Sequence, residues 1–375
     1  MKMTTDPIGL YVHIPFCVKK CAYCDFCSFP VCDIKNRAEY IDALCCELLS
    51  YKYKTVSVDS IFFGGGTPSL LSGDEFRKIT DAINESFVIS DNVEFTVECN
   101  PKTLTKENLD VYLGSGVNRI SIGLQSIHEK ELKKLGRIHS YEDFKKIYAM
   151  VRDSGIKNVS VDLMYGIPEQ NEESFMETLK NIVSLSPEHI SVYGLIVEDG
   201  TYLSDHIDNY ILPSEDSECN MYDSACNFLR ESGYFHYEIS NYSKSGYECR
   251  HNLKYWRDRE YIGVGVSAYS YFEGVRFGNS RDYSAYVRDY TICREFEEKI
   301  SHEGEKYEYA MLALRLSEGF SLREYREKFS CDFLDKKSNL VEKMSNLGLL
   351  KIEDDRIMLT EKGFYVSNSI LSELL

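Results

Sequence analysis

The sequence lacks any apolar run of the roughly 20 residues that a membrane-spanning helix needs. Its first residues, MKMTTDPIGLYVHIPFC, contain no hydrophobic segment typical of an export signal. Positive charge is also scarce, because 43 lysines and arginines face 60 aspartates and glutamates, which gives a net charge of −17. Nucleic acids and anionic membrane surfaces are bound through basic patches. We therefore expect a cytoplasmic protein with no integral membrane segment and no nucleic-acid partner.

Tryptophan is nearly absent, with one residue in 375, whereas the thirteen cysteines are many for a protein without an export signal. Disulfides belong to oxidising compartments, so we expect reduced thiols or metal ligands. Four cysteines fall between residues 17 and 27, and we interpret the scattered ones as small buried hydrophobic residues. A hydrophobic fraction of 43% and a charged fraction of 27% are typical of a folded protein, long enough here for one large domain and a small one.

The first half of the chain alternates between short β-branched or aromatic runs and longer helical patterns. We expect strands over 9–14, 60–63, 93–99, 119–124, 158–164 and 189–196. We expect helices over about 36–53, 73–87, 105–114, 141–154 and 172–185. This alternation predicts parallel βα units with right-handed crossovers. The periodicity leaves open whether the sheet is doubly wound or a full or partial barrel.

Polar and glycine-rich motifs accompany the ends of these strands. Cysteines follow the first strand and the run GGGTP follows the second. Glu98 lies in the third strand, Gln125 follows the fourth and Asp162 lies within the fifth. In barrels and in doubly wound sheets alike, ligands bind at the carboxyl ends of parallel strands. This clustering predicts one shared site.

The second half of the chain is less regular. We expect a helix over about 216–232 and interpret 260–280, which is rich in Gly, Tyr and Ser, as strands and loops that complete the main domain. Further helices are expected over 304–317, 321–329 and 333–346, followed by a hairpin in LLKIEDDRIMLT and a last helix over 361–374. Three helices and a hairpin resemble a winged helix. Its acidic composition favours a packing or partner role over DNA binding.

The strongest motif is Cys17-Val-Lys-Lys-Cys21-Ala-Tyr-Cys24, with the spacing C-x3-C-x2-C. Three thiolates on one loop suit a cubane [4Fe–4S] cluster whose fourth iron has no protein ligand. Structural zinc needs four ligands in paired C-x2-C units, and no second pair lies at a suitable distance. We therefore assign Cys17, Cys21 and Cys24 to an iron–sulfur cluster. Cys27 is interpreted as a nearby free thiol, because a fourth thiolate would close the open iron.

This motif after a first strand, with Tyr23 just before the third cysteine, resembles the signature of the radical-SAM superfamily. The resemblance implies that S-adenosylmethionine chelates the open iron and that its reductive cleavage yields a 5′-deoxyadenosyl radical. It also implies an α/β fold, a partial (βα)6 barrel followed by a small C-terminal α+β winged-helix-like domain. On this basis we expect a barrel core over 1–200, a family-specific extension over 201–300 and a C-terminal domain over 301–375.

Further motifs narrow the resemblance. YVHIPFC, GGGTP, VECNP, SIGLQS and VDLMYGIP are together similar to the oxygen-independent coproporphyrinogen III oxidase-like family, over essentially the whole chain. The residues that fall where that family contacts S-adenosylmethionine are Tyr11, Tyr23, Gly65, Gly66, Thr67, Glu98, Gln125, Arg137 and Asp162. The chemistry agrees, because Glu98 and Asp162 can accept hydrogen bonds from ribose hydroxyls and Arg137 can pair with the methionine carboxylate.

That family has a branch of oxidases, which decarboxylate coproporphyrinogen III, and a branch of HemW-type haem chaperones, which bind haem and hand it on. Two features differ from the oxidase branch. Phe26 stands at the last cysteine of the oxidase motif C-x3-C-x2-C-x-C, and only 16 residues precede Cys17, whereas oxidases carry a longer N-terminal segment. The run HNLKYW matches the H-N-x-x-Y-W motif of the chaperone branch, which implies haem binding at His251, Asn252, Tyr255 and Trp256. Imidazole is a common axial haem ligand, and aromatic rings offer flat faces to the macrocycle. Tyr269 stands where many relatives have histidine.

The preferred hypothesis is a haem carrier of the radical-SAM type, with a [4Fe–4S] cluster, S-adenosylmethionine and haem as cofactors. Its partners would be haem or another tetrapyrrole, a haem-acceptor protein and an electron donor. The alternative is an enzyme, either an oxygen-independent coproporphyrinogen III oxidase or another radical-SAM enzyme that acts on a tetrapyrrole. A third hypothesis is a cluster-bearing regulator that binds DNA through its C-terminal domain, and the acidic composition disfavours it.

Overall fold

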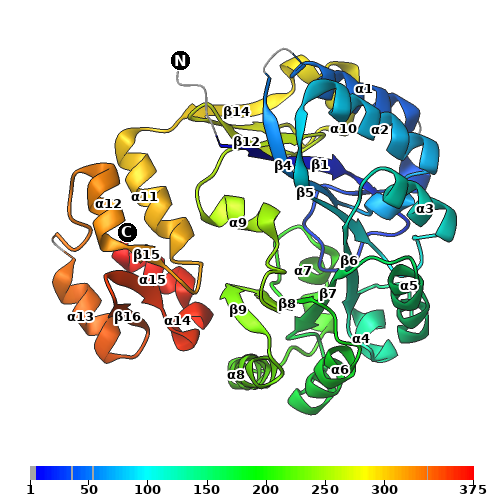
Figure 1. Ribbon diagram of the computed structural model, residues 1–375. Helices are drawn as coiled ribbons and strands as arrows, with labels where there is room; N and C mark the ends of the chain where they lie inside the picture. Colours follow the sequence, from blue (N-terminus) through cyan, green and yellow to red (C-terminus); the bar gives the residue numbers. More distant parts are fainter. Residues whose placement is uncertain (1–5, 35–36, 53–54, 336) are drawn as a thin grey trace.

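Six parallel strands form the centre of the structure, a computed structural model that describes residues 6–34, 37–52, 55–335 and 337–375 (Figure 1). The strands are β1 (Ile8–Ile14), β4 (Ser57–Gly65), β5 (Val88–Cys99), β6 (Arg119–Gln125), β7 (Asn158–Tyr165) and β8 (His189–Gly194). They lie side by side in the order of the sequence, and each pairs with the next in parallel. A doubly wound sheet reverses its strand order, so this sequential order confirms the barrel alternative.

Helices between the strands cover the outside of this curved sheet (Figure 1). They are α1 (Arg37–Leu49), α2 (Gly73–Ser86), α3 (Lys106–Gly114), α5 (Tyr141–Asp153) and α6 (Glu172–Ser184), close to the predicted ranges. Residues 36 and 53, at the ends of the helix expected over 36–53, lie outside the described residues. The short helix α4 (Glu129–Lys134) was not predicted.

The predicted helix starts carry explicit capping signals. At the start of α2, the Glu75 N–H donates to the Ser72 hydroxyl at 3.3 Å, and the Ser72 N–H donates to the Glu75 carboxylate at 2.7 Å. The same reciprocal pair forms at Ser140 and Asp143 before α5. A side-chain cap stabilises a helix by about 1 kcal/mol, which fixes where each of these helices begins.

Alternation along the strands gives the barrel an apolar outside and a polar inside. In β6, Ile120, Ile122 and Leu124 are fully buried and belong to the main hydrophobic core. The intervening Arg119 and Ser121 instead line a cavity inside the barrel. Successive side chains of a strand point to opposite faces, so the same division recurs around the sheet. The barrel interior is therefore a polar chamber rather than a packed core.

Additional strands extend both edges of the sheet, so the barrel stays open. Beyond β1 lie β11 (Tyr261–Val264), β12 (Tyr269–Phe272), β13 (Val275–Asn279) and β14 (Arg294–Lys299); beyond β8 lie β10 (Asn241–Ser243) and β9 (Phe235–Glu238). Strands over 260–280 were expected, and α8 (Glu215–Glu231) matches the helix expected over 216–232. The remaining elements here are β2 (Phe16–Cys17), β3 (Phe29–Pro30), α7 (Tyr202–Asp205), α9 (Arg250–Trp256) and α10 (Tyr283–Arg288), with short 3-10 turns at 31–33, 68–70, 207–209 and 290–292.

The chain ends in a small α+β unit. Its elements are α11 (His302–Ala313), β15 (Phe320–Ser321), α12 (Leu322–Phe329), α13 (Ser338–Asn346), β16 (Leu350–Glu353), β17 (Arg356–Leu359), α14 (Glu361–Tyr365) and α15 (Ser367–Leu374). The expected hairpin is present as β16 and β17, and β15 adds a third strand to it. The last helix, expected to be continuous, is interrupted at Val366. No described helix has both the length and the apolar character to cross a membrane.

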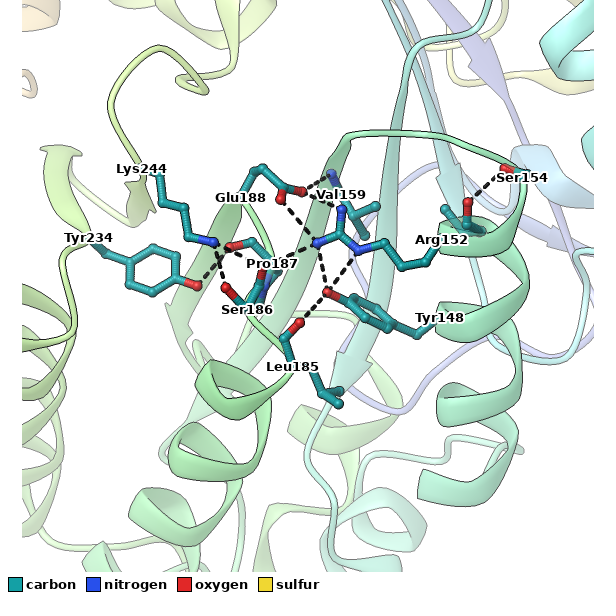
Figure 2. A network of polar contacts seen from close by, with 11 residues as sticks. Tyr148, Arg152, Ser154, Val159, Leu185, Ser186, Pro187, Glu188, Tyr234 and Lys244 are labelled. Atoms are coloured by element: carbon teal, nitrogen blue, oxygen red, sulfur yellow. Dashed lines mark hydrogen bonds and ion pairs between the residues drawn. The ribbon is translucent and has the colours of Figure 1, made fainter.

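A polar network fixes the end of the barrel opposite to the predicted site (Figure 2). The Arg152 guanidinium at the end of α5 pairs with the Glu188 carboxylate at 2.7 Å, and Glu188 also accepts from the Val159 N–H at the start of β7. The Tyr148 hydroxyl donates to the Leu185 carbonyl at 2.9 Å, and Tyr234 donates to the Pro187 carbonyl at 2.7 Å. The ion pair is only partly exposed, so these contacts anchor the segment that enters β8.

Candidate functional site

The three cysteines of the motif lie on the loop that leaves β1, and they line one cavity of about 270 Å³. Cys17 is buried, whereas Cys21 and Cys24 are half-buried. The loop is held in place by backbone bonds, among them Ala22 N–H to the Leu135 carbonyl at 2.9 Å. We call this space the outer cavity; besides the three thiols, it is lined by residues at the carboxyl ends of β4, β5, β6, β7 and β8.

Most of the residues predicted to contact S-adenosylmethionine line this outer cavity. They are Tyr23, Gly65, Gly66, Thr67, Glu98, Gln125, Arg137 and Asp162. Tyr11 does not, because it lines the neighbouring space inside the barrel and its hydroxyl lies 3.0 Å from His13 Nδ1. The structure thus gathers residues from six separate parts of the chain into one site.

The outer cavity presents polar atoms that the protein itself does not satisfy. Among the described residues, the buried Gln125 Oε1 and Arg137 Nε atoms have no hydrogen-bond partner. Arg137 Nη1 lies 3.6 Å from the Cys21 sulfur, and the Thr67 hydroxyl lies 3.7 Å from the Cys17 sulfur. Buried polar groups cost free energy unless they are paired, so these atoms indicate a polar ligand. Three thiols beside such atoms fit a cluster with one exchangeable iron.

The glycine run has a packing role that the sequence interpretation missed. Gly65 has a φ of 108°, and a Cβ there would lie 2.6 Å from the His13 ring. A Cβ at Gly66 would lie 2.7 Å from the Phe16 carbonyl oxygen. The missing side chains therefore let the cysteine-bearing segment pack directly against the end of β4. The approach of a ligand to this backbone remains a prediction.

Two carboxyl groups give the outer cavity its electrostatic character. Burial, followed by the charge of Asp162, raises the pKa of Glu98 to about 8. Burial also raises the pKa of Asp162, against the opposing effect of its hydrogen bonds with Ser191 and Ser121 and of the Arg119 charge. The Ser121 hydroxyl donates to Asp162 at 3.2 Å. Burial therefore favours the protonated form of Glu98 near neutral pH, and this side chain becomes an ionised acceptor for hydroxyl groups as pH rises through about 8.

Sequence reasoning missed several residues of the site. Asn100 donates from Nδ2 to the Thr67 hydroxyl at 2.8 Å and lines the outer cavity, as do Ser121 and Tyr193. Arg119 and Ser121 are two residues apart in β6, so their side chains point to the same face. This spacing could have identified them as residues of the barrel interior. Asn100 and Tyr193 carry a weaker signal, which is only their position at strand ends.

A second space, which we call the inner cavity, lies deeper in the barrel and has a volume of about 210 Å³. It shares Glu98 and Asp162 with the outer cavity. Its wall also contains Arg119, His189 and His251. Unlike the outer cavity, it contains none of the motif cysteines among its lining residues.

The HNLKYW run lies on the helix α9, which was not predicted from the sequence. The residues of this motif point to two different places. His251, Asn252 and Tyr255 line the inner cavity, whereas the Trp256 ring lies under the Arg315 guanidinium, 5.8 Å from its centre, toward the C-terminal unit. Figure 1 shows α9 between the strands β4 and β5 and the strand β9.

His251 is enclosed and has both ring nitrogens in hydrogen bonds. Its Nδ1 lies 3.1 Å from the Ser60 hydroxyl and its Nε2 lies 2.8 Å from the Tyr255 hydroxyl. The side chain is 1% exposed, and burial lowers its pKa to about 3. The imidazole is therefore neutral and bonded within the protein.

Two further positions singled out in the sequence lie away from both cavities. The Cys27 thiol is buried and lies 3.6 Å from the Arg281 carbonyl oxygen. Tyr269 is half-exposed on β12, and its ring packs against Phe296 with centroids 5.6 Å apart. Neither residue lines the outer or the inner cavity.

Comparison with known proteins identifies the superfamily and the fold. The sequence profile of the Radical SAM superfamily matches residues 11–182, and that of the HemN C-terminal domain matches residues 300–366. The solved structure of coproporphyrinogen III oxidase (HemN) from Escherichia coli, named there a radical SAM enzyme, superposes with a TM-score of 0.84 over 98% of this chain and 90% of that one, at 22% identity. This likeness confirms the predicted fold.

The chain belongs to the radical SAM superfamily, and within it to the family of proteins named heme chaperone HemW. The protein of that name from Lactococcus lactis is 34% identical over 100% of this chain and 98% of its own length. The one from Bacillus subtilis is 34% identical over 97% of this chain and 98% of its own. The predicted family is thereby confirmed, and membership of the superfamily implies an iron–sulfur cluster and S-adenosylmethionine as cofactors.

Proposed function

We propose that this chain is a radical-SAM haem carrier, which binds haem and passes it to an acceptor protein. The observation that carries the proposal is the outer cavity, where three thiols meet unsatisfied polar atoms at the carboxyl ends of the barrel strands. In this proposal Cys17, Cys21 and Cys24 hold a [4Fe–4S] cluster. When bound, the cluster supplies one iron open to an exchangeable ligand and a store for one electron.

Individual side chains of the outer cavity have roles that follow from their chemistry. The Arg137 guanidinium is placed to pair with the carboxylate of the methionine part of S-adenosylmethionine. Glu98 and Asp162 accept hydrogen bonds from ribose hydroxyls, and Gln125 Oε1 accepts one from a donor of the ligand. Tyr23 on the cluster loop and Gly65, Gly66 and Thr67 at the end of β4 line the same cavity.

Haem binding is supported by the names of the relatives and by the HNLKYW run, through which the family resemblance associates His251, Asn252, Tyr255 and Trp256 with haem. Ligation by His251 would require its bonds to Ser60 and Tyr255 to open first. The alternative function, oxidation of coproporphyrinogen III, has the shared fold as its support. Phe26, which stands at the position of the fourth motif cysteine of oxidases, speaks against it.

One experiment separates the two functions. The protein, reconstituted anaerobically, is incubated with reductant, S-adenosylmethionine and coproporphyrinogen III beside a genuine oxidase, and carbon dioxide loss is followed by mass spectrometry. We expect no decarboxylated product but saturable binding in a parallel haem titration. Product above background from a preparation with an intact cluster would contradict the proposal and establish the enzyme.

A further inference from the structure

The surface beside the cysteine loop carries positive charge, although the chain as a whole has a net charge of −17. Lys19 and Lys20 directly precede Cys21, and both lysines are exposed. The Lys20 ammonium donates to the Phe26 carbonyl oxygen at 3.1 Å, and neither lysine forms an ion pair within the described part of the chain. Two cations without a carboxylate partner therefore lie next to the proposed cluster ligands.

A shallow hollow of about 30 Å³ joins these charges to parts of the chain that are distant in sequence. Val18, Lys19 and Cys21 of the cysteine loop line the hollow together with Lys102, which follows β5, and Ile138, which precedes α5. Among the described residues, no carboxylate lines it. The shared hollow shows that these exposed side chains lie on one face, beside a proposed cluster ligand.

Exposed apolar side chains lie among the cations. Val18 and Ile138 in the hollow are 45% and 42% exposed. Phe26, which lines the outer cavity together with Cys24, is 69% exposed. Lys19 lines both the hollow and the outer cavity, so the two spaces adjoin at this residue. Several exposed apolar side chains gathered on one face indicate a surface that binds another protein.

We use the name cysteine-loop face for the surface made by Val18, Lys19, Lys20, Phe26, Lys102 and Ile138. We propose that this face docks an acidic protein that carries one electron and delivers it to the cluster. One electron leaves the carrier, which is oxidised, and enters the cluster, which is reduced, and no atom is transferred. The inference needs the cluster that the cysteines hold, but it does not depend on haem binding.

The position of the face fits delivery of an electron. The reductive chemistry that the family resemblance implies needs one electron from outside the protein. Electron transfer through protein slows steeply with distance, so a donor must dock where the cluster ligands approach the surface. Cys21 and Cys24 are half-buried at this face, whereas Cys17 is buried.

The charge distribution selects an acidic partner. A net charge of −17 repels an acidic protein from most of the surface, so such a partner is accepted only where the local charge is positive. Lys102 is partly offset by Asp143 at 3.5 Å, and Asp25 in the cysteine loop is paired with Arg281 at 3.5 Å. The two loop lysines remain for the carboxylates of a partner. A basic carrier would be attracted to the acidic remainder of the surface instead.

The test uses the full-length, cluster-reconstituted protein with an acidic flavodoxin as the probe. Isothermal titration calorimetry measures binding of the oxidised flavodoxin, and stopped-flow absorbance follows reduction of the cluster by the fully reduced flavodoxin. We expect Lys19→Glu to weaken binding and to slow reduction about fivefold at low salt. Added salt should weaken binding to the wild type and narrow its difference from the variant.

Lys157→Glu is the matched control. Lys157 is an exposed lysine directly before β7, at the end of the barrel opposite to the cysteines, and its replacement changes the net charge equally. This variant should bind flavodoxin nearly as the wild type does. Ile138→Ser should weaken binding without changing its dependence on salt. Dithionite, a small reductant that needs no docking face, should reduce the cluster of every variant to the same extent.

The possible outcomes are distinct. No binding of flavodoxin to the wild type, or equal affinity and rate in the wild type and Lys19→Glu, would overturn the inference. An equal loss in Lys19→Glu and Lys157→Glu would also overturn it, because net charge rather than this face would then control binding. Haem binding by a protein that flavodoxin does not reduce would leave the proposed function standing. Loss of haem binding would leave the docking result unaffected.

Discussion

The outer and inner cavities of the barrel differ in which of their buried polar groups have hydrogen-bond partners. In the outer cavity, Gln125 and Arg137 keep buried polar atoms without partners among the described residues. In the inner cavity, the buried Arg119 Nε atom also lacks a partner among the described residues. There, however, His251 has a partner for each ring nitrogen, and so does His189, bonded to Ser160 and Tyr237 at 2.8 Å each. Unsatisfied buried groups cost free energy that a ligand can recover, whereas satisfied ones rigidify the protein.

This difference assigns separate tasks to the two spaces. We propose that the outer cavity receives the ligand, whereas the hydrogen-bonded histidines of the inner cavity hold α9 and the barrel wall together. The contrast predicts that changes in the outer cavity affect cofactor binding, whereas changes in the inner cavity affect stability. The predictions below start with the largest effect.

The cysteine loop should give the largest effect. We expect Cys21→Ala, and equally Cys17→Ala or Cys24→Ala, to abolish the reconstituted cluster, because each change leaves only two of the three proposed thiolate ligands. Cys27→Ala is the matched control and should keep it, since that thiol faces the Arg281 carbonyl. Iron and sulfide analysis with visible absorbance measures the outcome. A full complement of four irons in Cys21→Ala would refute the assignment.

Arg137→Met should weaken S-adenosylmethionine binding about 10- to 100-fold, because a hydrogen bond to a charged partner contributes about 1.5–3 kcal/mol. Equilibrium dialysis on the reconstituted protein measures the dissociation constant. Arg257→Met, which removes an exposed arginine paired with Glu318, is the control and should leave it unchanged. Equal affinity in the Arg137 and Arg257 variants would remove Arg137 from the site.

Changes in the inner cavity should act on stability. His251→Ala is expected to lower the free energy of unfolding by about 2–4 kcal/mol, because it leaves a cavity and an unpaired Ser60 hydroxyl. The folded-state pKa of His251 is lowered from 6.5 to about 3, so its stabilising effect is complete above pH 6.5 and is lost as pH falls toward 3. Urea denaturation should show that the free energy of unfolding falls less between pH 7 and pH 5 in the variant than in the wild type. An identical fall in both proteins would exclude His251 as its cause.

Glu98 should give a smaller, pH-dependent effect on ligand binding. Its pKa of about 8 means that the ionised acceptor forms as pH rises through 8, so affinity for S-adenosylmethionine should increase over that range. Glu98→Gln should flatten the dependence. In the ligand-free protein the raised pKa has the opposite sign, because stability falls as pH rises from 4.5 to about 8. A wild-type affinity that is constant across this range would contradict the assigned role.

Much of the fold could be predicted from the sequence, because the signals were local. Capping pairs such as Ser72 with Glu75 and alternating apolar residues such as those of β6 mark their elements without tertiary information. The helix α9 was missed because its N-cap residue, Cys249, makes no side-chain cap hydrogen bond and because the helix is a short part of a longer aromatic segment. Whether the sheet forms a barrel depends on pairings between strands that are distant in the sequence, and no local pattern encodes these pairings.

The site was predictable where motifs follow strand ends, and less so elsewhere. Tyr11 matched the family motif, but its side chain lines the inner cavity and its hydroxyl lies 3.0 Å from His13 Nδ1. The reason for glycine at position 66 is a backbone contact with Phe16, which is distant in sequence.

The central claim is that the outer cavity holds a cluster with one iron open to S-adenosylmethionine. Its most direct test is electron paramagnetic resonance of the reduced, reconstituted protein with and without S-adenosylmethionine. We predict a [4Fe–4S] signal whose g-values shift when S-adenosylmethionine is added, and no such shift in Arg137→Met at the same concentration. A cluster signal that S-adenosylmethionine leaves unchanged in the wild type would contradict the account.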